Sequence, residues 1–239
     1  MISILDVAQY VRHTPALEKA DWFWNMLRKP YHHLLNLRGQ GARVSIGGCC
    51  AVCIPPEFTC SYWEAYEPET VRATVDWTKK NTTGLVLDVG CSMGIFSIVG
   101  LSVSEQAQVV AFDADLSSLK ATQRMCQYAK GDRLRLIYGL VSNQHLSSLR
   151  LNIAYQKTLE ALSNSGVTGD PGTTAYVCIE GNENSSVPIH SLDGLLLNEN
   201  LVKRPVLIKC DVEGAELLVL EGAKQLLERY RSSPYFLVL

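Results

Sequence analysis

The feature that most constrains the fold is a series of short apolar runs that alternate with helical patterns. "GLVLDVG", "QVVAFDAD" and "VLIKCDV" each read as a strand buried on both faces, because apolar residues fill them almost without interruption. "EPETVRATVDWTKKN" and the stretch after Leu116 have the spacing of amphipathic helices. The alternation predicts an α/β fold, a doubly wound and mostly parallel sheet with helices on both faces.

The 239 residues suit one such domain, over residues 67–239, preceded by an N-terminal extension over residues 1–66. "LRLIYGLVSN" and "PYFLVL" supply further strands. A polar segment between Gln144 and Ser186 is expected to be a loop with a β-excursion around "AYVCIE". Asp193 is expected to cap the helix that contains "GLLL".

Composition excludes several classes of partner. A net charge of −2 gives no basic excess with which to hold nucleic acid or an anionic membrane. "MISILDVAQYVRH" lacks the basic start of a secretory signal, and Asp88 and several glycines argue against a membrane span over residues 84–103. We therefore expect a soluble, cytoplasmic protein with no nucleic-acid or membrane partner.

Eight cysteines raise the question of a metal site. Four of them cluster at Cys49, Cys50, Cys53 and Cys60 and include one C-x-x-C. Zinc sites built on such pairs normally have a second pair or suitably placed histidines, which this cluster lacks. Ordinary reduced cysteines and no metal are the expectation.

The predicted strands end in acidic residues. Asp88 lies in the first, Asp113 and Asp115 end the second, and Asp211 and Glu213 follow the strand at "LIKCD". Because the carboxyl ends of parallel strands share one edge, where ligands bind, these residues predict an acidic rim. Asp115 reads better as a helix cap, and Asp211 is open between cap and site.

A glycine turn, Gly90-Cys91-Ser92-Met93-Gly94, follows the first acidic strand. Its G-x-x-x-G spacing lacks the middle glycine of a dinucleotide fingerprint, and no Walker lysine follows. An acid beside the turn suits an ammonium group, and Asp113, nineteen residues beyond Gly94, can accept hydrogen bonds from ribose hydroxyls. Ammonium and ribose without phosphate describe S-adenosyl-L-methionine, although Gly90 could also serve only a tight turn.

At these residues the sequence resembles a known family. "VLDVGCSMGIFSI" and "VVAFDAD" look like the first two motifs of class I S-adenosylmethionine-dependent methyltransferases. "VPIHSLDGLL" and "VLIKCDVEGAELLVLEGA" are similar to the FkbM-type family, and the resemblance extends from Glu67 to Leu239. It implies a Rossmann-like methyltransferase that methylates a hydroxyl of a small-molecule or glycan acceptor.

The resemblance also assigns roles to residues. It implies cofactor binding by Asp88, Gly90, Cys91, Ser92, Gly94 and Asp113, with Asp113 on the ribose. It places Asp211 and Glu213 beside the transferred methyl group as catalytic residues. His190 is the alternative base, against an ordinary loop histidine.

The sequence departs from the family at a few points. Ser92 replaces a common asparagine, and Asp113-Ala114-Asp115 replaces glutamate-proline-aspartate. The family continues beyond "PYFLVL" with a closing β-hairpin, which is apparently missing, so a catalytically inactive S-adenosylmethionine-binding or scaffold protein is the alternative. An apolar strand at an open edge would favour a homodimer.

Overall fold

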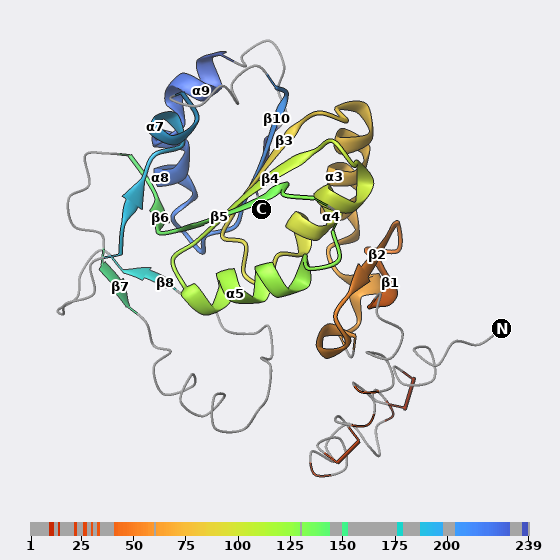
Figure 1. The fold of residues 1–239 in the computed structure, drawn as a ribbon. Helices are drawn as coiled ribbons and strands as arrows, with labels where there is room; N and C mark the ends of the chain where they lie inside the picture. Colours follow the sequence, from red (N-terminus) through yellow and green to blue (C-terminus); the bar gives the residue numbers. More distant parts are fainter. Residues whose placement is uncertain are drawn as a thin grey trace.

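A five-stranded parallel sheet forms the centre of the computed structural model (Figure 1). The structure describes residues 41–59, 61–129, 131–143, 150–152, 176–178, 187–197, 204–229 and 236–238, with isolated positions before residue 41. The strand order is β11-β10-β3-β4-β5, and all four pairings are parallel. The strands are β3 (Leu85–Val89), β4 (Gln108–Asp113), β5 (Leu134–Tyr138), β10 (Val206–Cys210) and β11 (Phe236–Val238).

The direction of winding reverses between β3 and β10. From β3 the chain proceeds outward to β4 and β5, then returns to β10 on the other side of β3 and continues to β11. In doubly wound sheets this point of reversal opens a crevice at the carboxyl ends of the strands, where ligands bind. The predicted doubly wound, mostly parallel sheet is confirmed.

Helices cover both faces of the sheet. Successive side chains of each strand point to opposite faces, so each strand contributes to two cores. Val86, Val109 and Leu207 face a core shared with α3 (Pro68–Lys80), α4 (Ile95–Val103) and α5 (Leu116–Met125). Leu87, Val110 and Ile208 face the opposite core, with α7 (Leu192–Leu197), α8 (Glu216–Glu221) and α9 (Lys224–Arg229). Figure 1 shows the two groups of helices on opposite sides of the sheet.

The predicted strand "LRLIYGLVSN" is two strands. Gly139, at φ 144°, separates β5 from β6 (Leu140–Val141), which pairs in parallel with β9 (Ile189–His190) in a separate two-stranded sheet. The β-excursion around "AYVCIE" is confirmed for β8 (Tyr176–Cys178), antiparallel to β7 (Arg150–Asn152). The rest of that predicted loop lies outside the described residues.

A hairpin lies within the predicted N-terminal extension. β1 (Ala42–Ile46) and β2 (Cys50–Ile54) pair antiparallel around Gly47 and Gly48, with buried and exposed residues alternating on both strands. The short helices η1 (Pro56–Phe58) and η2 (Trp63–Ala65) follow. Hairpin residues share a core with α3 and α4, so packing continues across residue 66, and the domain boundary there stays a prediction.

The cysteine cluster is divided by this hairpin. Cys50 is buried and Cys53 exposed, on opposite faces of β2, and Cys60 lies outside the described residues. Among the described residues no group of three potential ligands could hold a metal ion. In the same part of the chain, no helix has the length and apolarity needed to cross a membrane.

Asp193 caps a helix other than the one predicted. Ser191 Oγ accepts the Gly194 N–H at 2.9 Å and so caps α7 itself. Asp193 accepts the backbone N–H groups of Gln225 and Leu226 at 3.0 and 2.9 Å, in the first turn of α9. The tertiary packing of α7 against α9 places the carboxylate on the neighbouring helix.

Candidate active site

The exits of β3 and β10 touch at the point where the winding reverses. Gly90 has φ 74°, and a Cβ atom there would lie 1.9 Å from the backbone oxygen of Asp211. The Asp211 N–H in turn donates to the Val89 carbonyl at 3.0 Å. Gly90 is therefore required for the close approach of the two chain segments, whatever ligand binds beside them.

The backbone amides of the glycine turn (residues 90–94) donate to acceptors within the protein. Gly90 N–H and Cys91 N–H both donate to the Phe112 carbonyl at 3.0 Å, and Gly94 N–H donates to the Cys91 carbonyl at 2.7 Å. Ser92 N–H donates to Asp113 Oδ2 at 2.9 Å. Loops that cradle phosphate direct such amides toward the ligand. These four are already paired, which fits a ligand without phosphate at this turn.

Asp113, the last residue of β4, lies beside the turn with its carboxylate largely buried. Oδ2 accepts the Ser92 N–H, and Oδ1 accepts the Asp115 N–H at 2.9 Å. Burial raises the pKa of Asp113 to about 6, although the two N–H donors act in the opposite direction. The Cys91 thiol lies 3.9 Å from Oδ2 and makes only a weak contact, and each carboxylate oxygen has a second lone pair, so the carboxylate can still accept hydroxyl donors such as those of a ribose.

Asp115 acts as the predicted helix cap. It is the N-cap residue of α5, and its side chain accepts the Ser117 N–H at 2.9 Å. The Ser117 hydroxyl also contacts this carboxylate. The acidic pair at the end of β4 is thus divided between a helix cap and a residue of the rim.

The other residues of the glycine turn fix its shape against α5. The Thr122 hydroxyl lies 3.2 Å from Cys91 Sγ and 3.1 Å from the Ser92 carbonyl oxygen, while a Cβ on Gly94 would lie 2.9 Å from Thr122 Cα. Burial raises the pKa of the Cys91 thiol well above its usual range, which makes it unreactive. Ser92 is exposed with φ 50°, so its side chain is open to a ligand.

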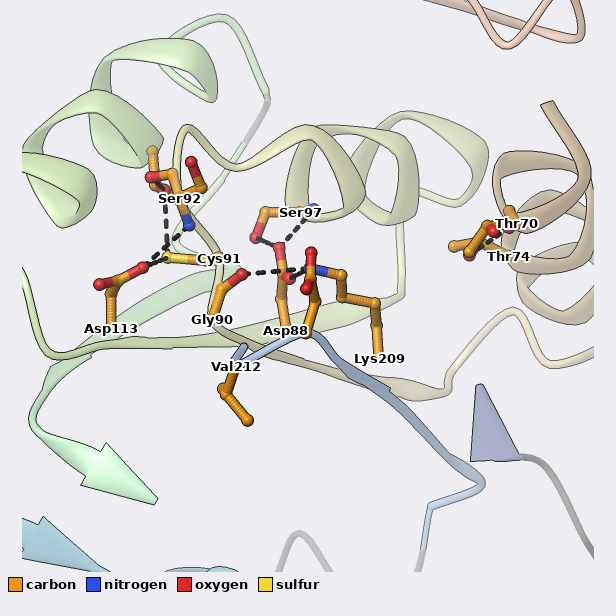
Figure 2. Close-up of polar contacts among 12 residues, drawn as sticks. Thr70, Thr74, Asp88, Gly90, Cys91, Ser92, Ser97, Asp113, Lys209 and Val212 are labelled. Atoms are coloured by element: carbon orange, nitrogen blue, oxygen red, sulfur yellow. Dashed lines mark hydrogen bonds and ion pairs between the residues drawn. The ribbon is translucent and has the colours of Figure 1, made fainter. Parts of the chain in front are cut away.

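Asp88 is 0% exposed and has partners inside the protein. Its Oδ2 accepts the backbone N–H and the hydroxyl of Ser97 at 3.0 and 2.7 Å, in the first turn of α4 (Figure 2). A carboxylate at a helix N-terminus is stabilised by the helix dipole. Direct contact between Asp88 and the methionine end of a cofactor stays a prediction.

Lys209 is the residue of the site that sequence reasoning missed. It is 3% exposed on β10, and its backbone lies opposite Asp88 in the sheet register. Its ammonium donates to the Gly90 carbonyl at 3.1 Å and lies 3.5 Å from Asp211 Oδ2 and 3.8 Å from Asp88 Oδ1 (Figure 2). A lysine inside an otherwise apolar strand is the signal that could have identified it.

Asp211 and Glu213 follow β10 at the rim. The Asp211 side chain is 40% exposed; Oδ2 faces Lys209, while Oδ1 has no hydrogen-bond partner among the described residues. Glu213 is exposed, with φ 49°, at the turn that leads to α8. Glu216 closes this turn by accepting the N–H groups of Val212 and Gly214 at 3.3 and 3.0 Å, which is a structural role.

His190, on β9, lies outside the five-stranded sheet and contacts the end of β5. Its Nε2 is 3.0 Å from the carbonyl oxygen of Tyr138, the last residue of β5. Three strand spacings separate β5 from β10, which corresponds to roughly 14 Å. The structure therefore does not bring His190 next to Asp211.

Tyr66 and Glu67 reach this region from the start of α3. The Tyr66 ring lies 6.3 Å from that of Phe96, centroid to centroid, and Phe96 also lies under the Lys209 ammonium at 5.1 Å. Burial, together with the nearby carboxylates of Glu67, Asp211 and Asp88, raises the pKa of Tyr66. Glu67 has φ 34°, and its buried Oε2 has no hydrogen-bond partner among the described residues.

Class I S-adenosylmethionine-dependent methyltransferases typically combine three features that are present here. These are a doubly wound sheet, a glycine turn that does not cradle phosphate, and an acid at the end of the next strand. The sequence profile of the FkbM methyltransferase domain matches residues 103–233, more than half of the chain. The chain belongs to the FkbM methyltransferase family, whose cofactor is S-adenosyl-L-methionine. No curated relative matches the sequence.

Solved methyltransferase structures show partial likenesses. A putative RNA methyltransferase from Pyrococcus horikoshii has 13% identity and a TM-score of 0.27, covering 42% of this chain and 45% of its own. A protein-L-isoaspartate O-methyltransferase has 14% identity and a TM-score of 0.29, covering 47% and 42%. An O-methyltransferase from Bacillus cereus, in complex with SAH, has 11% identity and a TM-score of 0.33, covering 95% and 86%.

This chain spans less than half the length of the first two of these structures. At such TM-scores the likenesses carry no weight for the site or its chemistry. The fold assignment rests on the strand order and on the two covered faces of the sheet.

Proposed function

We propose that this protein transfers the methyl group of S-adenosyl-L-methionine to a hydroxyl of a small or carbohydrate-like acceptor. The observation that carries the proposal is the contact between the Gly90 turn and the exit of β10. It sets the turn beside a half-exposed carboxylate, that of Asp211. The oxygen acceptor follows from the family resemblance, and the net charge of −2 favours a small-molecule or glycan acceptor over nucleic acid or membrane.

The residues present fit the cofactor. The Asp113 carboxylate retains lone pairs for the two ribose hydroxyls, and the paired amides of the turn leave no phosphate cradle. The exposed side chain of Ser92 and the Gly90 carbonyl lie at the same edge. When bound, S-adenosyl-L-methionine supplies an electrophilic methyl group on a cationic sulfur.

Asp211 is the proposed proton acceptor. The acceptor oxygen forms its bond to the methyl carbon as the sulfur–carbon bond breaks, and the hydroxyl proton passes to Asp211 Oδ1. Because Oδ2 faces Lys209, Oδ1 is the oxygen open to the acceptor. Glu213, two residues on and exposed, is proposed to assist. His190 is the less favoured candidate for the base, because it contacts the end of β5, three strands away from β10.

Ligand-dependent thermal unfolding tests the cofactor. S-adenosyl-L-methionine or its demethylated product, S-adenosyl-L-homocysteine, should stabilise the protein, by about 2.7 kcal/mol at a hundredfold excess over the dissociation constant. NAD and NADP should have no effect. Asp113→Ala is the control variant, in which the stabilisation should weaken. Stabilisation by NAD but not by the methyl donor would overturn the proposal.

Methyl transfer itself is tested with a donor that carries a radiolabelled methyl group. We expect label in at least one member of a panel of sugars, glycans and small alcohols, and less of it with Asp211→Asn. Binding of the donor with no transfer to any member would favour the inactive, cofactor-binding alternative.

A further inference from the structure

Lys209 is a buried cation at the junction of the glycine turn and the catalytic carboxylate. Its side chain is 4% exposed, and its ammonium contacts the Gly90 carbonyl, the carboxylates of Asp88 and Asp211, and the Phe96 ring. A buried ammonium costs several kcal/mol in lost hydration unless its partners offset it. A leucine or valine would fill a strand position without that cost, so the charge needs an explanation.

The two carboxylates beside Lys209 differ in exposure. The Asp88 side chain is 1% exposed and also accepts two hydrogen bonds from Ser97, whereas the Asp211 side chain is 40% exposed. The pair with Asp88 therefore belongs to the core. The contact with Asp211 extends from the core to the rim, where the reaction is proposed to occur.

We propose that Lys209 is a positioning residue for methyl transfer, acting through Asp211. Its ammonium holds Asp211 Oδ2 close to the Gly90 carbonyl, and this orientation leaves Oδ1 for the acceptor hydroxyl. It also offsets one of the two adjacent negative charges. This inference rests on the proposed function, because it assigns Lys209 to the same site.

The charge of Lys209 has a consequence that can be measured without knowing the acceptor. S-adenosyl-L-methionine carries a cationic sulfur, whereas S-adenosyl-L-homocysteine carries a neutral one. Removal of the ammonium leaves Asp88 and Asp211 uncompensated, so the site should favour the cation more strongly. Removal of the Asp211 charge should have the opposite effect.

Titration calorimetry measures the dissociation constants of both compounds. The quantity compared is the dissociation constant of S-adenosyl-L-homocysteine divided by that of S-adenosyl-L-methionine. We expect Lys209→Met to raise this ratio by about threefold or more and Lys209→Arg to keep it near the wild-type value. In the Asp211→Asn variant this ratio should be lower than in the wild type, because one negative charge near the cationic sulfur is gone. There, Lys209→Met should change it less, because part of the effect in the wild type comes from Asp211.

A second comparison, in the Asp88→Asn variant, covers the case in which Lys209→Met alone does not fold. Lys209→Met leaves the Asp88 carboxylate buried without its cation, which could prevent folding. Asp88→Asn removes that charge and keeps an oxygen for Ser97, so Asp88→Asn/Lys209→Met is compared with Asp88→Asn alone. The ratio should again rise in the protein that lacks Lys209.

The outcomes separate this inference from the proposed function. If both compounds bind more weakly to the Lys209 variants with an unchanged ratio, Lys209 is only structural and the inference is overturned. If the wild-type protein binds neither compound, the proposed function fails and the inference fails with it. The inference is supported if the ratio is raised in Lys209→Met but stays at the wild-type value in Lys209→Arg.

Discussion

Cofactor binding should depend on pH through Asp113. Burial raises its pKa from an ordinary 3.8 to about 6, so in the absence of ligand the group is about nine-tenths protonated at pH 5 and about nine-tenths ionised at pH 7. Ribose hydroxyls donate hydrogen bonds, and these are stronger to an ionised acceptor. S-adenosyl-L-homocysteine, which has no group that titrates in this interval, should therefore bind roughly tenfold more weakly at pH 5 than at pH 7.

The same shift affects the stability of the ligand-free protein with a definite sign. A folded-state pKa above the unfolded value means that the folded state holds the proton more tightly. Asp113 therefore costs no stability below about pH 4, and its cost grows as the pH rises through 6, to roughly 3 kcal/mol. Bound ligand should offset much of that cost, so the stabilisation by ligand should be larger at pH 7 than at pH 5.

Calorimetry at pH 5, 6 and 7 tests this reasoning on three proteins. Wild type should lose affinity as the pH falls, and Asp113→Asn should bind weakly with little pH dependence. Asp115→Asn is the matched control, since asparagine keeps the N-cap of α5 and the backbone N–H that Asp113 accepts. Its affinity should still fall with pH, with the curve displaced to lower pH because the Asp115 charge helps to raise the pKa of Asp113. An affinity that is flat between pH 5 and 7, or a pH dependence that persists in Asp113→Asn, would refute the assignment of Asp113 to the ribose.

Three other substitutions probe the contact between the ends of β3 and β10 and the residues around it. Gly90→Ala should destabilise the protein by at least about 2 kcal/mol in denaturant unfolding, because its Cβ would overlap the Asp211 backbone oxygen; an unchanged midpoint would contradict that geometry. Ser97→Ala should cost about 1.5–3 kcal/mol in the same assay, since Asp88 loses a buried hydrogen bond, and a smaller loss would mean that water replaces the hydroxyl. Asp211→Asn should lower turnover by roughly 10²–10⁴ while cofactor affinity stays within a few-fold; full turnover would leave Asp211 without a catalytic role.

The fold could be predicted where the sequence period was strong. β3, β4 and β10 read as nearly unbroken apolar runs, so their existence and parallel pairing followed from the alternation with helices. The hairpin at "RVSIGGCCAVCI" could also have been predicted. Its residues alternate between buried and exposed positions around a Gly-Gly turn, a pattern typical of a β-hairpin.

The rest depends on contacts between distant parts of the chain. Gly139 ends β5 because the following residues pair with β9, and no local pattern gives the position of that partner. The cap from Asp193 to α9 depends in the same way on how α7 and α9 pack. The pairing of Lys209 with Asp88 requires the register of two strands that are adjacent only in the folded sheet.

The acidic rim illustrates how register divides similar residues among different tasks. Asp88 lies one residue before the end of β3, so its side chain faces α4 on the same side of the sheet as Val86. There Ser97 donates hydrogen bonds to it and Lys209 offsets its charge. Asp113 ends β4 and meets the glycine turn, and Asp211 lies just beyond β10, half exposed. Each strand-end acid thus has its own partners: Asp88 is buried, whereas Asp113 and Asp211 retain acceptor capacity toward a ligand. One buried ammonium, that of Lys209, lies close to both Asp88 and Asp211. The positive charge that offsets the buried Asp88 carboxylate therefore also reduces the net negative charge at the rim.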